Sequence, residues 1–250
     1  MAAALRLVEV FESAQGEGIY LGARQTFVRL AGCNLSCPYC DTPAARAAQV
    51  LDAEFPAGQY RGRRRNPVAV SELTGELESM AARTRLHSVS WTGGEPLMQA
   101  EALQEAMGLA RAAGLRNYLQ TNGTLPGAMR RVAGLCDFVA MDIKLPSASG
   151  LAWNGDAVLE FIRAAEMSGL FVKAVVTSLT GGDEIALAAR TVARASRAIP
   201  FVIQPVTPVP QAPAIEPPSA EALLDLQAAA LDALNDVRII AQMHGRLGLR

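Results

Sequence analysis

The stretch CNLSCPYC, residues 33–40, decides how the rest of the chain is understood, because it places three of the chain's four cysteines within eight positions. Structural zinc takes four closed protein ligands, and the two histidines, His87 and His244, are far from this stretch in sequence. A 4Fe-4S cluster presents four irons, so three thiolates leave one iron open to a substrate or cofactor. The spacing favours an open-iron cluster, and zinc with a distant fourth ligand is the alternative. Cys136 precedes a predicted strand at the opposite end, where we expect a small buried residue.

The length and net charge of the chain limit the classes of protein to which it can belong. With 250 residues, half of them hydrophobic, the chain can bury a core as a single domain, 1–250. Its 23 basic and 24 acidic side chains give a net charge of -1, so we expect a small-molecule partner and neither nucleic acid nor a membrane. No apolar run reaches the roughly 20 residues of a membrane span, and MAAALRLVEV lacks the features of a secretory signal. We expect a cytoplasmic protein, where clustered cysteines bind metal more often than they form disulfides.

Short apolar runs alternate with longer Ala- and Leu-rich stretches, the pattern of parallel strands followed by crossover helices. Strands are predicted at Thr26–Leu30, His87–Trp91, Asn117–Gln120, Asp137–Met141, Leu170–Thr177, Phe201–Gln204 and Val237–Ile240. Helices are predicted at Ser71–Thr84, Gln99–Ala113, Asp156–Ser168, Asp183–Arg197 and Ser219–Asn235, with Ser71, Asp156, Asp183 and Ser219 as N-caps. The pattern predicts an α/β fold, a barrel or partial barrel of parallel strands with outer helices.

Polar motifs follow these strands where each one ends. The motifs are the cysteine loop, TGGEP at 92–96, TNG at 121–123, DIK at 142–144 and QPVT at 204–207. Because a barrel places its chemistry at the C-terminal strand ends, we expect all five to open onto one cavity. By contrast, RGRRR at 61–65 is predicted to be an exposed basic loop, and the Pro-rich segment 208–218 a connection within the domain.

Two of these motifs together carry a family resemblance. CNLSCPYC resembles the three-cysteine loop of the radical S-adenosylmethionine (SAM) superfamily, and TGGEP resembles its second signature. Gly93 and Gly94 let the backbone approach a ligand, and Glu95 can accept hydrogen bonds from an amine. The longer stretch FESAQGEGIYLGARQTFVRLAGCNLSCPYCDT, residues 11–42, is similar to the start of the 7-carboxy-7-deazaguanine synthases. This resemblance implies a partial or modified (β/α)6-type TIM barrel of the radical SAM core.

The resemblance also implies roles for individual residues. Cys33, Cys37 and Cys40 would hold a 4Fe-4S cluster, and Thr42 a magnesium ion. The SAM-binding residues would be Tyr39, Cys40, Asp41, Gly94, Glu95, Asp142, Ile143, Lys144, Gln204, Pro205, Val206 and Thr207. The substrate-binding residues would be Ala14, Gln15, Gly16, Glu17, Arg29, Thr92, His244 and Arg250, the last through its terminal carboxylate in a substrate-closing tail, 237–250. Many relatives read Ser-Pro-Lys where this chain has Asp142-Ile143-Lys144.

The reaction implied by the resemblance belongs to queuosine and 7-deazapurine biosynthesis. A 5'-deoxyadenosyl radical from SAM would abstract hydrogen at C6 of 6-carboxy-5,6,7,8-tetrahydropterin, and ring contraction with loss of ammonia would give 7-carboxy-7-deazaguanine. An external donor such as flavodoxin or ferredoxin and a homodimeric state are implied as well. The alternatives are a glycyl-radical-enzyme activase, a related radical SAM enzyme with another substrate, and a non-enzymatic iron-sulfur or zinc module.

Overall fold

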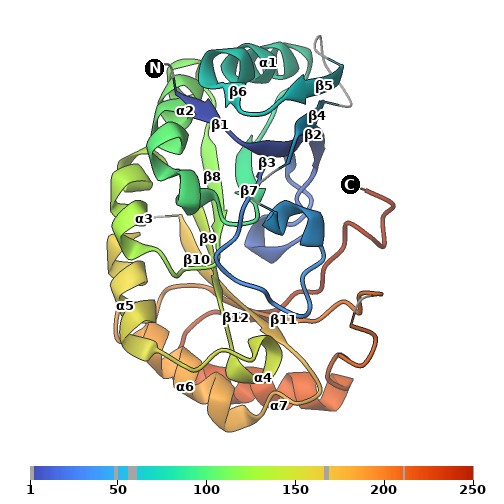
Figure 1. Ribbon diagram of the computed structural model, residues 1–250. Coiled ribbons are helices and arrows are strands. Elements are labelled where there is room, and N and C mark those ends of the chain that lie inside the picture. The colour runs from blue at the N-terminus through green and yellow to red at the C-terminus, as the bar shows by residue number, and fades with distance from the viewer. Residues whose placement is uncertain (1–2, 48–49, 56–60, 166–168, 211, 250) are drawn as a thin grey trace.

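A mostly parallel sheet with helices on its outer side forms the body of the molecule (Figure 1). The structure is a computed structural model, and it describes residues 3–47, 50–55, 61–165, 169–210 and 212–249. The parallel strands are β3 (Arg24–Leu30), β7 (Ser88–Gly93), β8 (Asn117–Thr121), β9 (Phe138–Ile143), β10 (Leu170–Val176), β11 (Phe201–Pro205) and β12 (Val237–Ile239). All seven strands predicted from the sequence are confirmed. Buried on both faces, they appear in the sequence as nearly continuous apolar runs.

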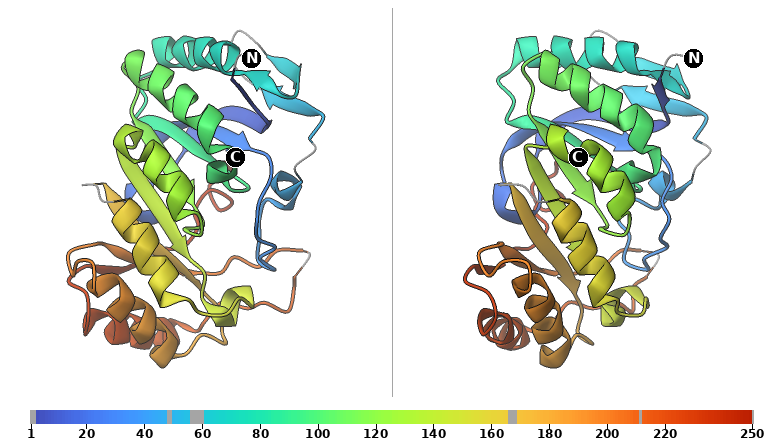
Figure 2. Two further views of the ribbon diagram at one scale, coloured as in Figure 1. Left: turned by 60° about the vertical axis from the view of Figure 1, so that its left-hand side comes forward. Right: turned by 90° about the vertical axis from the view of Figure 1, so that its left-hand side faces the viewer.

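Six strand-and-helix units can be followed along the chain, because each of the first six parallel strands is followed by a helix before the next one. The helices are α1 (Val70–Arg83), α2 (Ala100–Ala112), α3 (Pro126–Val132), α5 (Gly155–Ala164), α6 (Gly182–Ala193) and α7 (Ala220–Leu231), with the short α4 (Pro146–Ser149) after β9. Figures 1 and 2 show these helices arrayed around the outside of the curved sheet. The strand order is β12-β11-β10-β9-β8-β7-β3-β2-β4-β5, with β12 and β5 at opposite ends, which is an open, partial barrel of the (β/α)6 type.

Side chains from the parallel strands alternate between two apolar regions. The outward face packs on the helices, and its largest fully buried members include Trp91, Leu30 and Phe201. The inward face forms a smaller cluster at one end of the barrel, made of Tyr118, Ala140, Phe171 and Val202. Tyr20, from the 3₁₀ turn η1 (Gly18–Tyr20), packs against this inner cluster. One end of the barrel interior is therefore filled, and the polar inward-facing residues gather toward the other end.

The N-terminal part of the sheet was not predicted. β2 (Leu7–Ala14) pairs antiparallel with β3, β4 (Asp52–Phe55) pairs with β2, and β5 (Gly62–Arg65) pairs antiparallel with β4. A separate two-stranded sheet joins β1 (Ala4–Leu5) to β6 (Val68–Ala69). Further 3₁₀ turns are η2 (Pro43–Arg46), η3 (Pro96–Gln99) and η4 (Ala133–Leu135).

The prediction of a loop at 61–65 was wrong, because most of RGRRR is strand β5. Its guanidinium groups pair with neighbouring carboxylates, Arg63 with Glu54 at 3.4 Å and Arg65 with Asp52 at 3.8 Å. Both arginine side chains stay largely exposed, as predicted for a solvated basic segment. A charged edge strand carries no apolar period, so the sequence pattern does not reveal it.

Of the four predicted N-caps only Ser219 is confirmed, its side chain accepting a hydrogen bond from the N–H of Ala222 at 3.1 Å. The N-cap of α5 is Asn154 and that of α6 is Gly181. Asp156 and Asp183 instead lie in the first turn of their helices, where a carboxylate is stabilised by the helix dipole. Ser71 likewise lies inside α1, which begins at Val70. The end of the helix predicted at Asp156–Ser168 falls partly outside the described residues.

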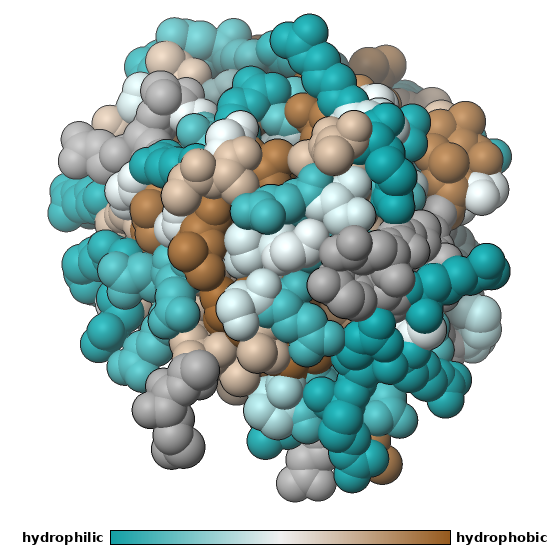
Figure 3. Space-filling model, turned by 90° about the horizontal axis from the view of Figure 1, so that it is seen from above, coloured by the Kyte–Doolittle hydropathy of each residue, from teal (hydrophilic) through white to brown (hydrophobic). Residues whose placement is uncertain are grey.

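Two expectations about the surface and interior can be checked. Cys136 is buried, as expected, and its thiol donates to the carbonyl of Val132 at 3.4 Å. Within the described ranges, none of the helices has the length and apolar character required to span a membrane. The face seen in Figure 3 is largely hydrophilic, with apolar side chains in separated groups.

Asn117, at the start of β8, generates a prediction about stability. Its fully buried side chain accepts from the indole N–H of Trp91 and donates to the carbonyls of Met107 and Leu135. Asn117→Ala removes these three hydrogen bonds and leaves the indole N–H of buried Trp91 without the partner that the wild type gives it, so we expect a loss of about 3 kcal/mol in the free energy of unfolding, measured with urea. The exposed N-cap variant Asn154→Ala, as control, should lose about 1 kcal/mol. Equal losses for the two variants would contradict this account.

Candidate active site

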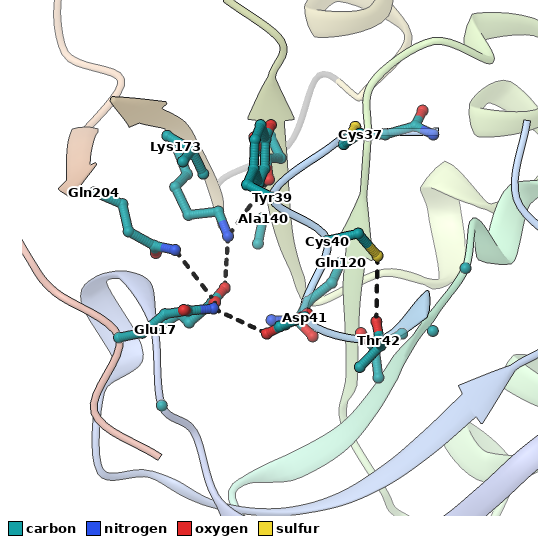
Figure 4. Close-up of a pocket in the computed structure, with 18 of the residues that line it drawn as sticks. Glu17, Cys37, Tyr39, Cys40, Asp41, Thr42, Gln120, Ala140, Lys173 and Gln204 are labelled. Carbon is teal, nitrogen blue, oxygen red and sulfur yellow. Dashed lines mark hydrogen bonds and ion pairs between the residues drawn. The ribbon is translucent and has the colours of Figure 1, made fainter. Parts of the chain in front are cut away.

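A cavity of about 370 Å³ opens at the C-terminal ends of the parallel strands. All five polar motifs that follow the strands contribute to its lining, as do the segment 14–17 and the C-terminal tail. Its polar lining residues are Gln15, Glu17, Arg29, Cys33, Cys37, Tyr39, Cys40, Asp41, Thr42, Arg46, Thr92, Gln120, Thr121, Asn122, Asp142, Lys144, Lys173, Gln204, Thr207, Gln242 and His244. The prediction of a single cavity formed from these motifs is confirmed. Figure 4 shows several of its side chains from separate strands and loops.

The cysteine loop gives the cavity its three sulfurs. Cys33, Cys37 and Cys40 are partly exposed, are not in disulfides and line the same space. Across the described ranges, no three His, Cys, Asp or Glu side chains are gathered closely enough to hold a single metal ion. Thiolates that ligate different irons of a cube stand farther apart than ligands of one ion, so this donor set fits a three-thiolate iron-sulfur cluster better than zinc.

Hydrogen bonds attach the cysteine loop to the loop after β8. The amide of Asn34 donates to the hydroxyl of Thr124, and the amide of Asn122 donates to the oxygen of Asn34, both at 2.8 Å. The backbone N–H of Leu35 also points at the sulfur of Cys33, 3.5 Å away. Because the loop is held by its neighbours rather than by regular structure, the three sulfurs depend on these contacts for their orientation.

Gly94 is required where the TGGEP turn crosses the cysteine loop. A Cβ atom at this position would lie 2.0 Å from the backbone oxygen of Gly32, which no side chain can tolerate. The N–H of Gly94 donates to Leu30, and the N–H of Glu95 donates to Gly32. These two hydrogen bonds attach the turn to the end of β3 and to the residue that precedes Cys33, and they bring the two signature motifs together.

Glu95 lies beneath the cavity, fully buried, and joins two loops. Its carboxylate accepts from the N–H of Leu97, the hydroxyl of Thr121 and the N–H of Asn122, at 3.1, 2.9 and 2.7 Å. Burial raises the pKa of Glu95 to about 7, and the hydrogen bonds partly oppose this. These contacts position the loops after β7 and β8, while the expected bond from Glu95 to a ligand amine stays a prediction.

A row of opposite charges crosses the cavity wall from the cysteine loop to the segment 14–17. Lys144 lies 3.2 Å from the hydroxyl of Tyr39 and 3.0 Å from Asp142. Lys173 lies 3.5 Å from the same Asp142 carboxylate and 2.5 Å from Glu17. Asp142 thus joins two lysines, one toward each end of the cavity.

Glu17 receives donors from three other parts of the chain. Besides Lys173, the amides of Gln204 and Gln242 donate to its carboxylate, and Figure 4 shows Lys173 and Gln204 pointing toward Glu17. Burial raises the pKa of Glu17, but Lys173 and the amide of Gln242 outweigh it and lower the value to about 2. Glu17 is therefore a fixed negative charge in the cavity at neutral pH.

The C-terminal tail lies against this carboxylate. Gln242 donates to both Glu17 and Asp41, and the N–H of Met243 donates to the carbonyl of Gly16 at 2.9 Å. His244 Nε2 lies 3.8 Å from the carboxylate of Asp41. The tail predicted to close the site therefore lies at the cavity, while Arg250 is outside the described residues.

Arg29 lines the cavity from β3 but already has a protein partner. Its Nε donates to Glu9 at 2.8 Å, and its guanidinium lies over the ring of Phe11, 5.7 Å from the ring centre. A guanidinium carries five N–H groups, so a substrate carboxylate can share it with Glu9. Ala14, Gly16 and Thr92 also line the cavity, as expected for substrate-binding residues.

The other predicted ligand-binding residues differ in where they lie. Thr42 is at the cavity, with its hydroxyl 4.0 Å from the sulfur of Cys40, and Val206 and Thr207 are at the rim after β11. Ile143 is buried in the core that packs on the helices, and Pro205 does not contribute to the lining. Only the backbones of these two residues can serve a ligand directly.

Two buried oxygens in the lining have no hydrogen-bond partner within the described part of the chain: Asp142 Oδ1 and Gln204 Oε1. A buried acceptor without a donor is costly, so both are suited to a ligand that carries N–H or O–H groups. SAM offers such donors in its amino group and ribose hydroxyls, and the residues present therefore fit both SAM and the cluster.

Lys173 and Gln242 are among the site residues that the sequence analysis missed, as are Arg46 and Gln120. Lys173 does carry a signal, since it is a single charge within the apolar strand FVKAVV, and a buried charge needs a partner. Gln242 carries none, because its role depends on where the tail folds back.

Comparisons with known proteins show the family to which the chain belongs. Residues 28–192 match the Radical SAM superfamily. A 7-carboxy-7-deazaguanine synthase from Geobacter sulfurreducens is 39% identical over 97% of this chain and 96% of its own length. One from Archaeoglobus fulgidus is 36% identical over 98% of each chain.

Solved structures share the fold. QueE from Escherichia coli superposes with a TM-score of 0.60 at 19% identity, covering 96% of this chain and 94% of its own. Streptococcus suis SuiB bound to S-adenosylmethionine gives a TM-score of 0.57 at 15% identity, covering 84% of this chain and 48% of its own. With the sequence matches over nearly the whole length, the cysteine loop and the cavity at the strand ends, the chain belongs to the radical SAM superfamily and, within it, to the 7-carboxy-7-deazaguanine synthase family.

Proposed function

We propose that this enzyme converts 6-carboxy-5,6,7,8-tetrahydropterin to 7-carboxy-7-deazaguanine with loss of ammonia, as a cytoplasmic step of queuosine or other 7-deazapurine biosynthesis. The observation that carries the proposal is that the three-cysteine loop and the Gln15, Glu17 and Arg29 side chains line the same cavity. When bound, the 4Fe-4S cluster and SAM supply a 5'-deoxyadenosyl radical. The chain's own residues then have to bind, orient and enclose the substrate.

The charges of the cavity complement such a substrate. The pterin carries a carboxylate at one end and an amino-pyrimidine rich in N–H donors at the other. Arg29 offers a guanidinium for the carboxylate, and the ionised Glu17 offers an acceptor for N–H groups. Thr92 and His244 complete the proposed substrate contacts from β7 and from the tail, and the tail limits access of water from its side of the cavity.

The proposed SAM contacts lie toward the cysteine loop. Tyr39, Asp41, Gly94 and the residues around Lys144 and Gln204 would hold the cofactor, leaving the segment 14–17 to the pterin. Thr42 is the proposed magnesium ligand, since a hydroxyl oxygen is a suitable hard donor. An external one-electron donor of the flavodoxin or ferredoxin type and a homodimeric state are part of the same proposal.

An anaerobic assay tests this function directly. Reconstituted protein given SAM, magnesium, a reductant and the carboxytetrahydropterin should form the deazaguanine acid, detected by mass. Replacing Cys33, Cys37 or Cys40 with Ala should abolish both cluster absorbance and SAM cleavage, because each thiolate holds an iron. Cys136→Ala is the matched control and should keep both. Full activity in any of the three loop variants, or no product from the wild type, would contradict the proposal.

Arg29 provides a test of substrate binding. Arg29→Ala should raise KM for the pterin by a factor equivalent to a loss of about 2 to 3 kcal/mol in binding free energy, because a charge-assisted pair with the carboxylate is lost. Steady-state kinetics under anaerobic conditions measures the effect. Arg24→Ala removes an exposed arginine of the same strand, paired with Glu12, and should leave KM unchanged. An unchanged KM in Arg29→Ala would place the carboxylate elsewhere.

The ionised state of Glu17 predicts a pH dependence. Because its pKa is lowered from 4.5 to about 2, its contribution to stability is complete above pH 4.5 and is lost as pH falls toward 2. The shift corresponds to about 3 kcal/mol. Urea unfolding should therefore show the wild type losing stability below pH 4.5 more steeply than Glu17→Gln.

A surface carboxylate gives the control for that measurement. Glu160 forms an exposed ion pair with Arg130. Glu160→Gln should change the free energy of unfolding by no more than about 1 kcal/mol, and its loss of stability below pH 4.5 should be as steep as that of the wild type. If the stability of Glu17→Gln declines with falling pH as steeply as that of the wild type, Glu17 is not held ionised by its partners.

A further inference from the structure

A chain of hydrogen bonds runs through the interior of the barrel, from its filled end to the cavity. The ring of His87 lies 2.9 Å from the hydroxyl of Ser88, through Nδ1. The amide of Gln25 donates to that hydroxyl at 2.9 Å, and the amide of Gln15 donates to Gln25 Oε1 at 2.9 Å. Gln15 Oε1 then accepts from the backbone N–H of Glu17 at 3.2 Å. Gln15, Gln25 and Ser88 are each at least 98% buried.

The direction of this chain is determined by its last member. A backbone N–H can only donate, so Gln15 must turn its oxygen to Glu17 and its nitrogen to Gln25. Gln25 must then accept through Oε1 and donate through Nε2 to Ser88. The hydroxyl of Ser88 accepts from Gln25, and it can donate its own hydrogen to Nδ1 of His87 when that nitrogen carries no hydrogen. Every amide orientation between Glu17 and His87 therefore follows from one backbone group.

We propose that Gln25 and Ser88 are positioning residues for pterin recognition, because they hold the Gln15 amide in one orientation at the cavity. This inference rests on the proposed function. With its orientation held, Gln15 presents its remaining N–H and its remaining lone pair to the cavity in a set order. An amide free to turn by 180° would present either order to the ring edge of the substrate. The chain of hydrogen bonds therefore selects one of the two donor and acceptor patterns that Gln15 could present.

The backbone supports this arrangement. Gln25 of β3 and Ser88 of β7 are direct register partners in the parallel sheet, so their side chains point to the same face. Gln15 is held independently by two backbone bonds of its own, from its N–H to Ala23 and from Gly22 to its carbonyl. The amide is thus fixed at both ends, by the turn that carries it and by the strand beside it.

The surroundings of His87 favour a neutral ring, which can accept from Ser88. The rings of Tyr20 and Phe138 lie against it, with centroids 5.3 and 4.8 Å away, and Arg116 donates to its carbonyl at 2.8 Å. Burial and the charge of Arg116 lower the pKa of His87. If Nδ1 carried a hydrogen, it would donate to the hydroxyl of Ser88, which would then accept from both His87 and Gln25.

Substitutions of Gln25 test the proposal by kinetics. Gln25→Leu removes both hydrogen bonds at similar size, and we expect KM for the carboxytetrahydropterin to rise about tenfold while kcat falls less than about twofold. Gln25→Glu keeps an acceptor facing Gln15 in either protonation state and should stay within about threefold of the wild-type KM. Cluster content and SAM binding, measured on each reconstituted protein, should be unchanged.

A second measurement uses His87 and needs no substrate. The chain has two histidines, so ¹⁵N-histidine spectra of the cluster-loaded protein contain two ring systems, and His87→Phe identifies the relevant one. We expect the neutral form of His87 with hydrogen on Nε2. Gln25→Leu, two bonds away, should raise the titration midpoint of His87, since a serine that accepts a hydrogen bond donates more strongly. Ser88→Ala, which removes a small group with little risk to folding, should raise it too.

The two measurements separate the possible outcomes. A rise in KM for Gln25→Leu, its rescue in Gln25→Glu and a shifted His87 midpoint support the proposal together. A titration midpoint of His87 that is unaffected by both Gln25→Leu and Ser88→Ala overturns it. Equal KM values for the two Gln25 variants and the wild type overturn it as well. If the wild type forms no deazaguanine while the His87 midpoint still shifts, the hydrogen-bond chain stands and the proposed substrate fails.

Discussion

The buried carboxylate of Glu17 holds together four parts of the chain that are far apart in sequence. It lies in the segment before β3 and receives Lys173 from β10, Gln204 from β11 and Gln242 from the tail. A buried charge of this kind is tolerated only when it is paired and hydrogen-bonded, so each of these donors is needed to keep it in place. The cavity depends on this convergence, because it fixes the N-terminal segment and the tail against the mouth of the barrel.

The barrel interior is divided between two kinds of chemistry. Aromatic and aliphatic side chains around Tyr118 and Phe171 fill one end, while lysines, carboxylates and amides occupy the other. The apolar end excludes water, and in such surroundings the charge pairs above it interact more strongly than they would in solvent. Lys144, Asp142, Lys173 and Glu17 alternate in sign, so the charges of these four side chains balance one another.

The two signature motifs are joined by structure as well as by function. Gly94 allows the turn after β7 to pass directly over the backbone of Gly32, and Glu95 attaches that turn to the loop after β8. The loop after β8 in turn holds Asn34 of the cysteine loop. The orientation of the cysteine loop therefore depends on contacts made by residues outside it, such as Asn122 and Gly94.

The parallel strands, their helices and the loops that carry the chemistry could be predicted from the sequence alone. Buried strands and amphipathic helices leave local periodic patterns, and the Cys33–Cys40 and TGGEP motifs are short and contiguous, so both could be identified without tertiary information. Tertiary contacts alone establish the strand pairing of 7–14, 52–55 and 62–65, the residues that cap α5 and α6, and the partners of Glu17 and Glu95. Lys173 and Gln242 are 156 and 225 positions from Glu17. Pairing over such distances depends on where the whole chain places each side chain, and no local pattern of residues records it.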